Sequence, residues 1–595
     1  LRVAGLNLEN GARVFCYANG PTNTIQVTGA DAFATAVSNE INIVYTTPPQ
    51  VGSTNKLIKF SGTIMGDGTN AFALGSLPGG VAGYLQTNAA DTTVELVITN
   101  LGPGYIWTGS IDTNWNIAGT ANWTSGGTPG TYVNYMPALF NDTATRYTVN
   151  VAQVVSPNGV TVSNTTDYLF AGVGIGGPSG LTKIGTGVVT MAALHSYQGP
   201  TLISNGTFVA NTLANGGSPS SIGAAATNSG NLTINGATLK YTGGSATINR
   251  MFTVGSSGGA INITNSATTL TINGAGWILN GTLTKRGPGT LRFTGFKVSY
   301  PNATLDFVVE EGLLSFDSEY DWEGASMSNT RIVVTNGASL YSNAGAFGGV
   351  PWATEGSLQQ VIVEKNSTWT ISNYRAWIQG GTYGAAGRVV LRGGSVSGGY
   401  FSPFYSLTIQ SLACDTNSSC ATGLDPYGTG TSTIDVEDGS ADPDFIMSGA
   451  ISAGVTTLNK TGAGKLRYTS TLSSGTVNVN GGSLILDGTA TGAVTVKLGG
   501  TLGGTGTVAG AVSVESGGIL APGNAGVAGT LAISSDLTIA SGSSVYRVKI
   551  AGIASNQHDM ITVSGAVDLG DATLEIDPAG LADPGLDSIV FLVNK

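Results

Sequence analysis

The chain has few of the residues on which charge-driven recognition and catalysis depend. Only 10% of its 595 residues are charged, and it contains two histidines and three cysteines. Its formal net charge is −11, with no basic stripe. Nucleic acid and anionic membrane surfaces are therefore not expected partners, because both are bound through clusters of Lys and Arg. No apolar run reaches the roughly 18–20 residues that span a bilayer, so we expect no membrane insertion by this segment.

Signals for α-helices are also scarce, because apolar residues do not recur with the spacing of an amphipathic helix. Instead, 90 glycines and many Ser, Thr and Asn residues separate short runs of alternating apolar and polar side chains. Glycine lacks the three-residue spacing of collagen, and 41% apolar residues are too many for a disordered tail. The composition predicts an all-β fold of short strands joined by tight turns.

One short motif, Leu-x-Lys-x-Gly-x-Gly, occurs three times and is followed each time by an alternating strand. Its lysines are Lys183, Lys285 and Lys460. The paired glycines permit a tight bend, and the apolar residues on either side are expected to point into one core. The lysine is expected to lie over the turn with its charged head in water.

This motif resembles the autotransporter-associated β-strand repeat of bacterial passenger proteins. The glycine-rich stretch 499–508, followed by 517–524, is similar to the same repeat. The resemblance covers most of the chain as a style of repeat. It implies a right-handed parallel β-helix, which is a solenoid of stacked turns, on an extracellular or cell surface.

The two ends of the chain resemble each other. Residues 1–104 are expected to form a terminal β-rich module, and residues 531–595 a truncated second copy of it. The two segments share the pattern Ile-x-Val-[Ser/Thr]-Gly-Ala, at Ile25–Ala30 and Ile561–Ala566. Such an echo indicates a repeat architecture. It predicts head-to-tail continuity, either within one longer chain or between subunits of a filament.

Between these modules we expect two further regions. Residues 105–175 open the solenoid, and residues 176–530 form its main body, with an irregular insertion at about 315–450. The opening contains three tryptophans spaced eight residues apart, which either cap the first turn or form a platform for stacking glycans: Trp107, Trp115 and Trp123.

Two acidic clusters are candidates for a cation site. The first alternates along one segment and comprises Asp317, Glu319, Asp321 and Glu323. The second comprises Asp435, Glu437, Asp438, Asp442 and Asp444. Because carboxylate and carbonyl oxygens are the ligands that Ca²⁺ prefers, the second cluster is a candidate Ca²⁺ site. The alternatives are a solvated acidic surface or a carboxylate pair for glycoside cleavage.

The insertion also carries candidate residues for contact with glycans, because insertions in solenoids often project from a binding face. These are the aromatic side chains of Trp322, Trp352, Trp369 and Trp377.

The cysteines bear on whether the protein is found inside or outside the cytoplasm. Cys414 and Cys420 lie in one short segment and are predicted to close a small loop as a disulfide, the alternative being two unpaired thiols. Cys16 is expected to be a buried strand residue. A disulfide would place the protein outside the cytoplasm.

These features predict a non-enzymatic extracellular structural or adhesive protein: a surface fibre, sheath or adhesin stalk that assembles with copies of itself. No catalytic residue is assigned, because His195 and His558 have no nucleophile motif beside them and are expected in turns. No cofactor other than Ca²⁺ is considered. The alternative is a carbohydrate-binding or carbohydrate-cleaving β-helix protein that acts through the 315–450 insertion.

Overall fold

The computed structural model divides into two compact units, Leu1–Thr253 and Val254–Lys595. It describes residues 1–18, 24–36, 39–45, 49–75, 77, 81–101, 104–274, 276–294, 298–299, 306–317, 331–343, 360–372, 375–376, 387–403, 407–426, 429–524, 527–552, 554 and 557–578. Within these ranges every regular element is a β-strand, apart from the short 3-10 helices Gly68–Ala71 and Ser229–Asn231. The predicted all-β class is therefore confirmed.

The first unit begins with three turns of chain, each contributing three strands. The strands are β1 (Arg2–Val3), β2 (Leu6–Leu8) and β3 (Arg13–Ala18), then β4 (Ile25–Ala30), β5 (Phe33–Thr35) and β6 (Asn39–Tyr45), then β7 (Thr54–Ser61), β8 (Ile64–Gly66) and β9 (Phe72–Leu74). Equivalent strands of successive turns pair in parallel, as β3 does with β6. The hairpin of β10 (Ala82–Asn88) and β11 (Thr93–Asn100) then pairs antiparallel with β7.

A second stack of turns in this unit opens with a short antiparallel cap. Its first strands are β12 (Tyr105–Trp107), β13 (Asn114–Trp115), β14 (Trp123–Ser125) and β15 (Thr128–Gly130). Trp107, Trp115 and Trp123 are at most 1% exposed. The Trp123 ring centroid lies 5.2 Å from those of Trp107 and Trp115, and 4.9 Å from that of Tyr132. The three tryptophans therefore form a core cap, and the glycan-platform alternative is wrong.

The turns after this cap form two parallel sheets in the first unit. One sheet contains β12, β16 (Ala138–Asn141), β18 (Val160–Ser163), β20 (Leu181–Ile184), β22 (Thr201–Ile203) and β24 (Leu232–Ile234). The other contains β13, β17 (Thr148–Val151), β19 (Tyr168–Gly172), β21 (Val188–Met191), β23 (Thr207–Ala210) and β25 (Ala237–Tyr241). β26 (Ala246–Ile248) and β27 (Thr253–Val254) follow at the end of the unit.

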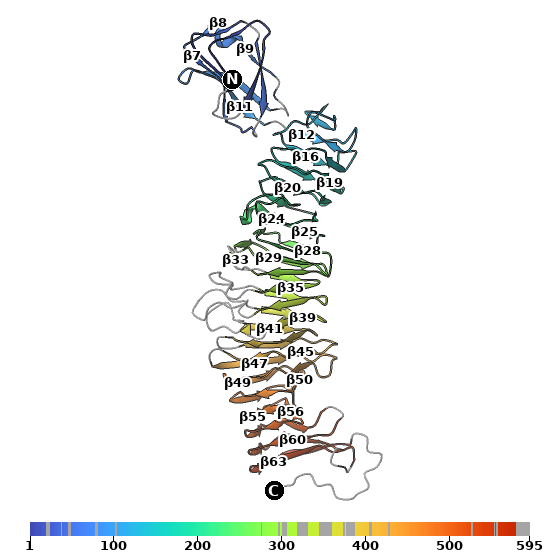
Figure 1. Ribbon diagram of the computed structural model, residues 1–595. Helices are drawn as coiled ribbons and strands as arrows, with labels where there is room; N and C mark the ends of the chain where they lie inside the picture. Colours follow the sequence, from blue (N-terminus) through green and yellow to red (C-terminus); the bar gives the residue numbers. More distant parts are fainter. Residues whose placement is uncertain are drawn as a thin grey trace. The chain divides into compact units, whose positions relative to one another are not determined.

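The second unit continues this pattern in two long parallel sheets (Figure 1). One contains β28 (Gly259–Ile263), β31 (Leu283–Arg286), β34 (Asp306–Val309), β36 (Arg331–Val334), β38 (Gln360–Val363), β41 (Gly387–Leu391), β44 (Leu407–Ser411), β47 (Gly430–Val436), β49 (Val455–Thr461), β52 (Thr476–Val479), β55 (Ala493–Val496), β58 (Val512–Val514), β61 (Leu537–Ile539) and β64 (Val567–Asp568). The other contains β29 (Thr269–Ile272), β32 (Thr290–Phe293), β35 (Leu313–Phe316), β37 (Ser339–Ser342), β39 (Thr368–Ile371), β42 (Ser395–Ser397), β45 (Ser418–Cys420), β48 (Phe445–Met447), β50 (Lys465–Tyr468), β53 (Gly482–Leu486), β56 (Gly500–Gly504), β59 (Ile519–Pro522), β62 (Val545–Lys549) and β65 (Thr573–Asp577).

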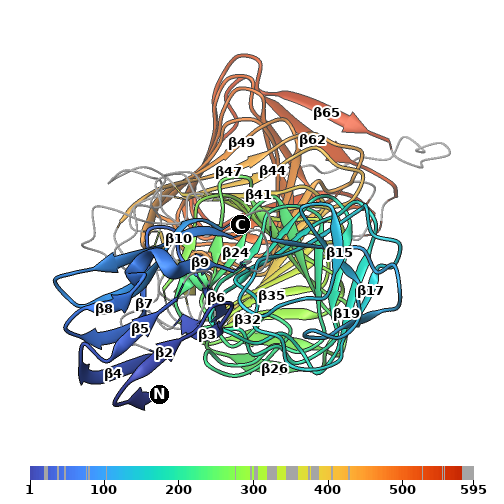
Figure 2. The same cartoon turned by 90° about the horizontal axis from the view of Figure 1, so that it is seen from above.

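Shorter strands form further sides of the stack. They are β30 (Trp277–Leu279) with β33 (Val298–Ser299), then β40 (Arg375–Ala376), β43 (Tyr400–Phe401) and β46 (Gly423–Leu424), and finally β51 (Thr471–Leu472), β54 (Thr489–Ala490), β57 (Thr507–Val508), β60 (Thr530–Ile533) and β63 (Met560–Val563). Figure 2, seen from above, places β41, β44 and β47 over one another, as their parallel pairing requires. This arrangement is consistent with a parallel β-helix.

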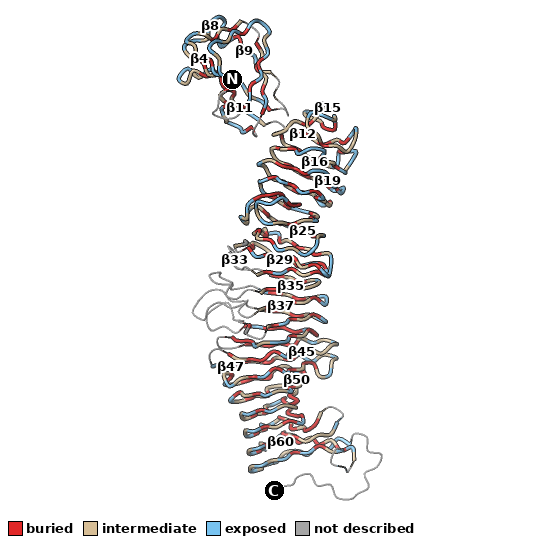
Figure 3. Tube along the Cα trace, viewed as in Figure 1, coloured by how far each residue is buried: buried red, intermediate tan, exposed pale blue. Residues whose placement is uncertain are grey.

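Ladders of aliphatic side chains form part of the core of the second unit. Because side chains alternate along a strand, one residue in two points inward. Val477, Val494 and Val512 pair in register on three successive turns, and each is at most 1% exposed. Along these strands buried positions alternate with positions of intermediate exposure, the red and tan segments of Figure 3. Stacking of like residues in register fills the narrow interior with small apolar groups.

The stack passes through the region predicted to be an insertion. Strands from β36 to β47 lie within residues 315–450 and pair in parallel with their neighbours. The described parts of this region therefore belong to the stack. The stack also continues past residue 531, because β60, β61 and β62 pair with the strands of the preceding turn. The two segments that share the Ile-x-Val pattern lie on β4 and β63, and the isoleucines that begin the pattern, Ile25 and Ile561, are both buried.

The lysines of the repeated motif are buried, which corrects the prediction that their heads lie in water. Lys183, Lys285 and Lys460 are all 0% exposed. Lys460 Nζ donates to the carbonyl oxygens of Thr461 at 2.8 Å, Gly462 at 3.1 Å and, in the next turn, Gly481 at 3.0 Å. Lys183 and Lys285 make the same three kinds of contact. The three N–H donors of each ammonium thus satisfy carbonyl groups that the tight turn leaves unpaired.

The first glycine of the repeated motif, two residues after the lysine, is required by the backbone conformation of the turn. Gly462 has φ of +77°, and a Cβ there would lie 2.2 Å from the carbonyl oxygen of Val436. A larger residue would meet both a strained conformation and the preceding turn. The motif therefore encodes one turn geometry: glycine permits the bend, and lysine satisfies its carbonyls.

Candidate functional site

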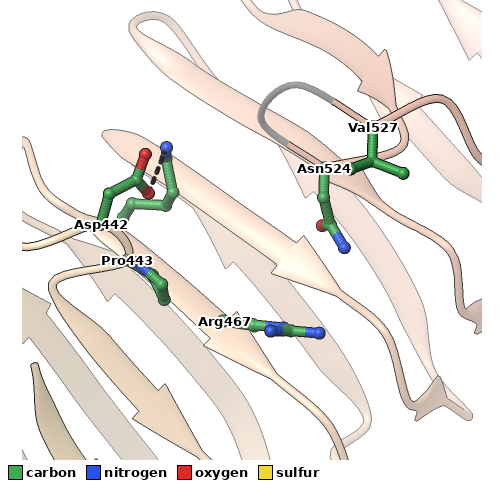
Figure 4. Close-up of a pocket in the computed structure, with 6 residues that line it drawn as sticks. Asp442, Pro443, Arg467, Asn524 and Val527 are labelled. Atoms are coloured by element: carbon green, nitrogen blue, oxygen red, sulfur yellow. Dashed lines mark hydrogen bonds and ion pairs between the residues drawn. The ribbon is translucent and has the colours of Figure 1, made fainter.

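A cleft in the second unit lies on the outer face of the sheet that contains β50. Alternation along β50 buries Leu466 and Tyr468 and leaves Lys465 and Arg467 on the outside. The cleft has a volume of about 360 Å³ and is lined by Asp442, Pro443, Lys465, Arg467, Asn524 and Val527. Figure 4 shows Asp442 and Pro443 on one side and Asn524 and Val527 on the other. The cleft thus joins the loop before β48 to the segment after β59.

Two ion pairs fix the charged side chains of this cleft. Lys465 Nζ lies 2.7 Å from Asp442 Oδ1, and Arg467 Nε lies 2.7 Å from Asp487 Oδ2. Burial acts to raise the pKa of Asp487. The hydrogen bonds from Arg467 and Thr505 outweigh this effect and hold the pKa of this carboxyl below its ordinary value. Asp487 is therefore an anion at neutral pH and orients the Arg467 guanidinium.

Asn524 forms the far wall of the cleft. Its main-chain oxygen accepts a hydrogen bond from Lys549 Nζ at 2.7 Å, and its Nδ2 lies 3.4 Å from both carboxylate oxygens of Asp487. Its Oδ1 is buried and has no hydrogen-bond partner in the part of the chain that the structure describes. Nearby Val527 is 64% exposed, so its apolar side chain faces solvent.

The second acidic cluster does not assemble into the predicted Ca²⁺ site. Asp435 accepts hydrogen bonds from Gln410 and Thr461, and Glu437 accepts one from the main chain of Ala413. Among the described residues, no three acidic, histidine or cysteine side chains lie close enough together to hold a metal ion.

The remaining acids of this cluster also have separate roles. Asp442 pairs with Lys465 at the cleft, whereas Asp438 is exposed. Asp444 is 6% exposed and accepts the main-chain N–H groups of Gly439 and Lys465, each at 2.8 Å. Four of the five carboxylates are therefore bound by different groups of their own or neighbouring turns, so the cluster does not converge on one cation.

The first acidic cluster falls mostly outside the described residues, which include only Asp317 of its four members. Asp317 pairs with Arg292 and accepts a hydrogen bond from Ser315 Oγ at 2.6 Å. Its role is to join adjacent turns on the outer face of the sheet.

Of the four tryptophans predicted to contact glycans, the structure describes the side chain of Trp369 alone. This residue is 0% exposed on β39, with its Nε1 donating to Ser342 Oγ at 3.0 Å and its ring 5.6 Å from that of Phe401. The prediction is therefore wrong for Trp369, because strand alternation turns it into the core. Trp322, Trp352 and Trp377 lie outside the described residues.

The predicted disulfide is also wrong, since Cys16, Cys414 and Cys420 are all free thiols. Cys420 is on an inward position of β45 and is 1% exposed, whereas Cys414 lies before this strand and is partly exposed. Burial raises the pKa of the Cys420 thiol to about 12. The Cys420 side chain points into the core, whereas Cys414 is partly exposed, so their proximity in sequence does not bring the two sulfur atoms together. Cys16 is a buried strand residue, as predicted.

His195, which was expected in a turn, is a buried residue of the first unit and forms an isolated β-bridge with Ser220. Its Nδ1 accepts the main-chain N–H of Ile175 at 3.0 Å, and burial lowers its pKa to about 3. The imidazole is therefore neutral at physiological pH and contributes to packing.

Sequence reasoning did not identify most of the cleft. Lys465 and Arg467 directly follow the third copy of the repeated motif, but Asn524 and Val527 come from the chain after β59. Only the vertical stacking of turns brings these segments together. The available signal was the strand Lys-Leu-Arg-Tyr, in which two cations occupy alternate, outward positions.

Comparison with known proteins gives one partial similarity. Neither a family model nor a solved structure matches the chain, and no helix among the described residues is long and apolar enough to cross a membrane. Over 141 residues, or 23% of this chain, the sequence is 43% identical to the adhesin BmaC autotransporter of Brucella suis biovar 1 (strain 1330). The matched stretch is only 4% of that protein's length. This similarity supports a relation to autotransporter proteins.

Proposed function

We propose that this chain is a non-enzymatic adhesive or structural segment of an extracellular, surface-displayed protein. The 43% identity to an autotransporter adhesin over 141 residues is the observation that carries this proposal. The long parallel sheets support it, because a stack of turns presents side chains on an extended surface. We further propose that the stack is a right-handed parallel β-helix, since parallel crossover connections are right-handed in nearly all proteins.

A cell-binding experiment tests the adhesive role. Fluorescent beads coated with the full chain should bind several-fold more to at least one cell type of a broad panel than beads coated with albumin. Beads carrying the heat-unfolded chain are the matched control, because they present the same composition without the stacked surface. Equal binding of folded, unfolded and albumin beads to every cell type would contradict the adhesive function.

The second part of the proposal is head-to-tail assembly. Strands β1, β2 and β3 in the first unit, and β63, β64 and β65 in the second, each pair on one side only among the described strands. Their open backbone groups are those that another turn would complete, either in a longer chain or in another copy. The Ile-x-Val pattern that β4 and β63 share supports this proposal, because it occurs near both ends of the chain.

Sedimentation velocity measures this assembly directly. We expect the sedimentation coefficient of the purified chain to increase with protein concentration as subunits join. A single species of 59.9 kDa at every concentration would count against assembly of separate copies. It would leave continuity within a longer chain as the reason for the similar ends.

A further inference from the structure

The cleft beside β50 has hydrogen-bonding groups that its own contacts do not use. Lys465 Nζ makes one ion pair with Asp442 Oδ1, so it retains N–H groups that can donate to a ligand. Arg467 is bound to Asp487 through Nε, and its terminal nitrogens extend from that contact. The second oxygen of Asp442 is an acceptor beside Lys465, on the side of the cleft away from Asn524 and Val527. A ligand in this cleft would therefore meet both donors and an acceptor.

The charges in the cleft favour a neutral ligand. The two cations, Lys465 and Arg467, are each paired with a carboxylate, so the site carries no net charge from these four groups. The chain as a whole has a net charge of −11, which opposes the approach of anions. A neutral molecule with many hydroxyl groups suits this balance, because each hydroxyl both donates and accepts.

Shape and apolar contacts point in the same direction. The cleft of about 360 Å³ is at the small end of the range for ligand pockets. Pro443 and the 64% exposed Val527 give it apolar groups on opposite sides. A pyranose ring combines hydroxyl groups at its edge with C–H groups on its faces. It therefore matches a site that has paired charged groups and two small apolar contacts.

We propose that the cleft formed by Asp442, Pro443, Lys465, Arg467, Asn524 and Val527 binds one or two units of a neutral saccharide. The saccharide's hydroxyl groups are bound by Lys465, Arg467 and Asp442, and a ring face packs against Val527. This proposal deepens the adhesive function and rests on it for its biological setting, since an extracellular surface exposes the cleft to glycans.

Binding of the full chain to an array of neutral and acidic glycans tests this inference. We expect binding to a subset of neutral glycans. Val527→Trp should weaken that binding at least about tenfold, because the indole occupies the cleft. Asp442→Asn should weaken it as well, since it alters an acceptor and releases Lys465. The matched control is Leu498→Trp, which places the same side chain at a 72% exposed position outside the cleft and should leave binding unchanged.

Three results would overturn the saccharide site. They are no binding to neutral glycans, a preference for acidic glycans, or neutral-glycan binding that Val527→Trp and Leu498→Trp affect equally. Amide hydrogen exchange in β50 and β59 checks that each variant keeps the native stack. If coated beads bind cells while the glycan array shows no binding, the saccharide site fails and the adhesive function stands. If neither binds, both proposals fail.

Discussion

Replacing Lys460 by methionine should lower the free energy of unfolding by about 2–4 kcal/mol, because three carbonyl groups lose their donor. Methionine replaces the four-atom apolar stem of lysine and lacks only its terminal nitrogen, so the loss reports mainly on the ammonium group. Lys460 is 0% exposed, and water cannot replace its contacts without opening the turn. The measurement is chemical denaturation of the full chain, combined with hydrogen exchange of the amides in β49 and β52.

Lys497→Met is the matched control for this change, because Lys497 is partly exposed and lies on the next turns of the same stack. Its expected effect is within about 0.5 kcal/mol. Equal effects of the two substitutions would contradict the structural role of the buried ammonium.

The buried lysine also predicts a pH dependence. Burial lowers the pKa of Lys460 from 10.5 to about 8. Between these two values the unfolded chain binds more protons at this residue than the folded chain does. The stability of the wild type should therefore rise with pH over this window relative to that of Lys460→Met.

Replacing Trp123 by alanine should destabilise the first unit by about 3–5 kcal/mol, the usual cost of removing a large buried aromatic side chain. Trp123 is 1% exposed and packs against Trp107, Trp115, Tyr132 and Phe140 with ring centroids 4.9–5.3 Å away. Its loss would leave a cavity at the centre of the cap. The expected readout is a lower denaturation midpoint together with loss of near-ultraviolet circular dichroism from the aromatic cluster.

Two further variants separate packing from other effects of this change. Trp123→Phe should cost less than Trp123→Ala, because the Trp123 indole N–H is buried with no hydrogen-bond acceptor among the described residues. Ile111→Ala is the exposed control, since Ile111 is 61% exposed, and it should be nearly neutral. A mild effect of Trp123→Ala, similar to that of Ile111→Ala, would mean that the cluster is not the cap of the stack.

The fold was the more predictable part of this protein. Alternation in strands such as Thr-Val-Asn-Val at 476–479 identifies inward residues directly, and the structure buries Val477 and Val479. The spacing of glycines indicated turns, and Gly462 occupies one with positive φ. The fate of Lys460 was not predictable in the same way. Its acceptors include Gly481 of the next turn, and sequence alone does not show which carbonyl groups a turn leaves open.

The candidate sites depended on features that a linear pattern does not contain. Nearness in sequence suggested a disulfide, but strand alternation buries Cys420 and leaves Cys414 partly exposed. The acidic loop suggested a metal site, but Asp444 is used by backbone N–H groups and Asp442 by Lys465. Asn524 and Arg467 line the same cleft only because the intervening turns stack on one another. The pairing register that decides these contacts is a property of the assembled stack.

The parallel register of the turns has a consequence for how the protein forms. Apart from the terminal β64 and β65, each strand in the long sheets of the second unit pairs with a strand of the turn before it and a strand of the turn after it. A completed turn is therefore a template that lowers the entropic cost of ordering the next segment. A chain delivered end first can acquire structure progressively as it arrives, with each new segment condensing on the one before it. Folding in this way gives growth a direction and needs no contact between distant parts of the chain.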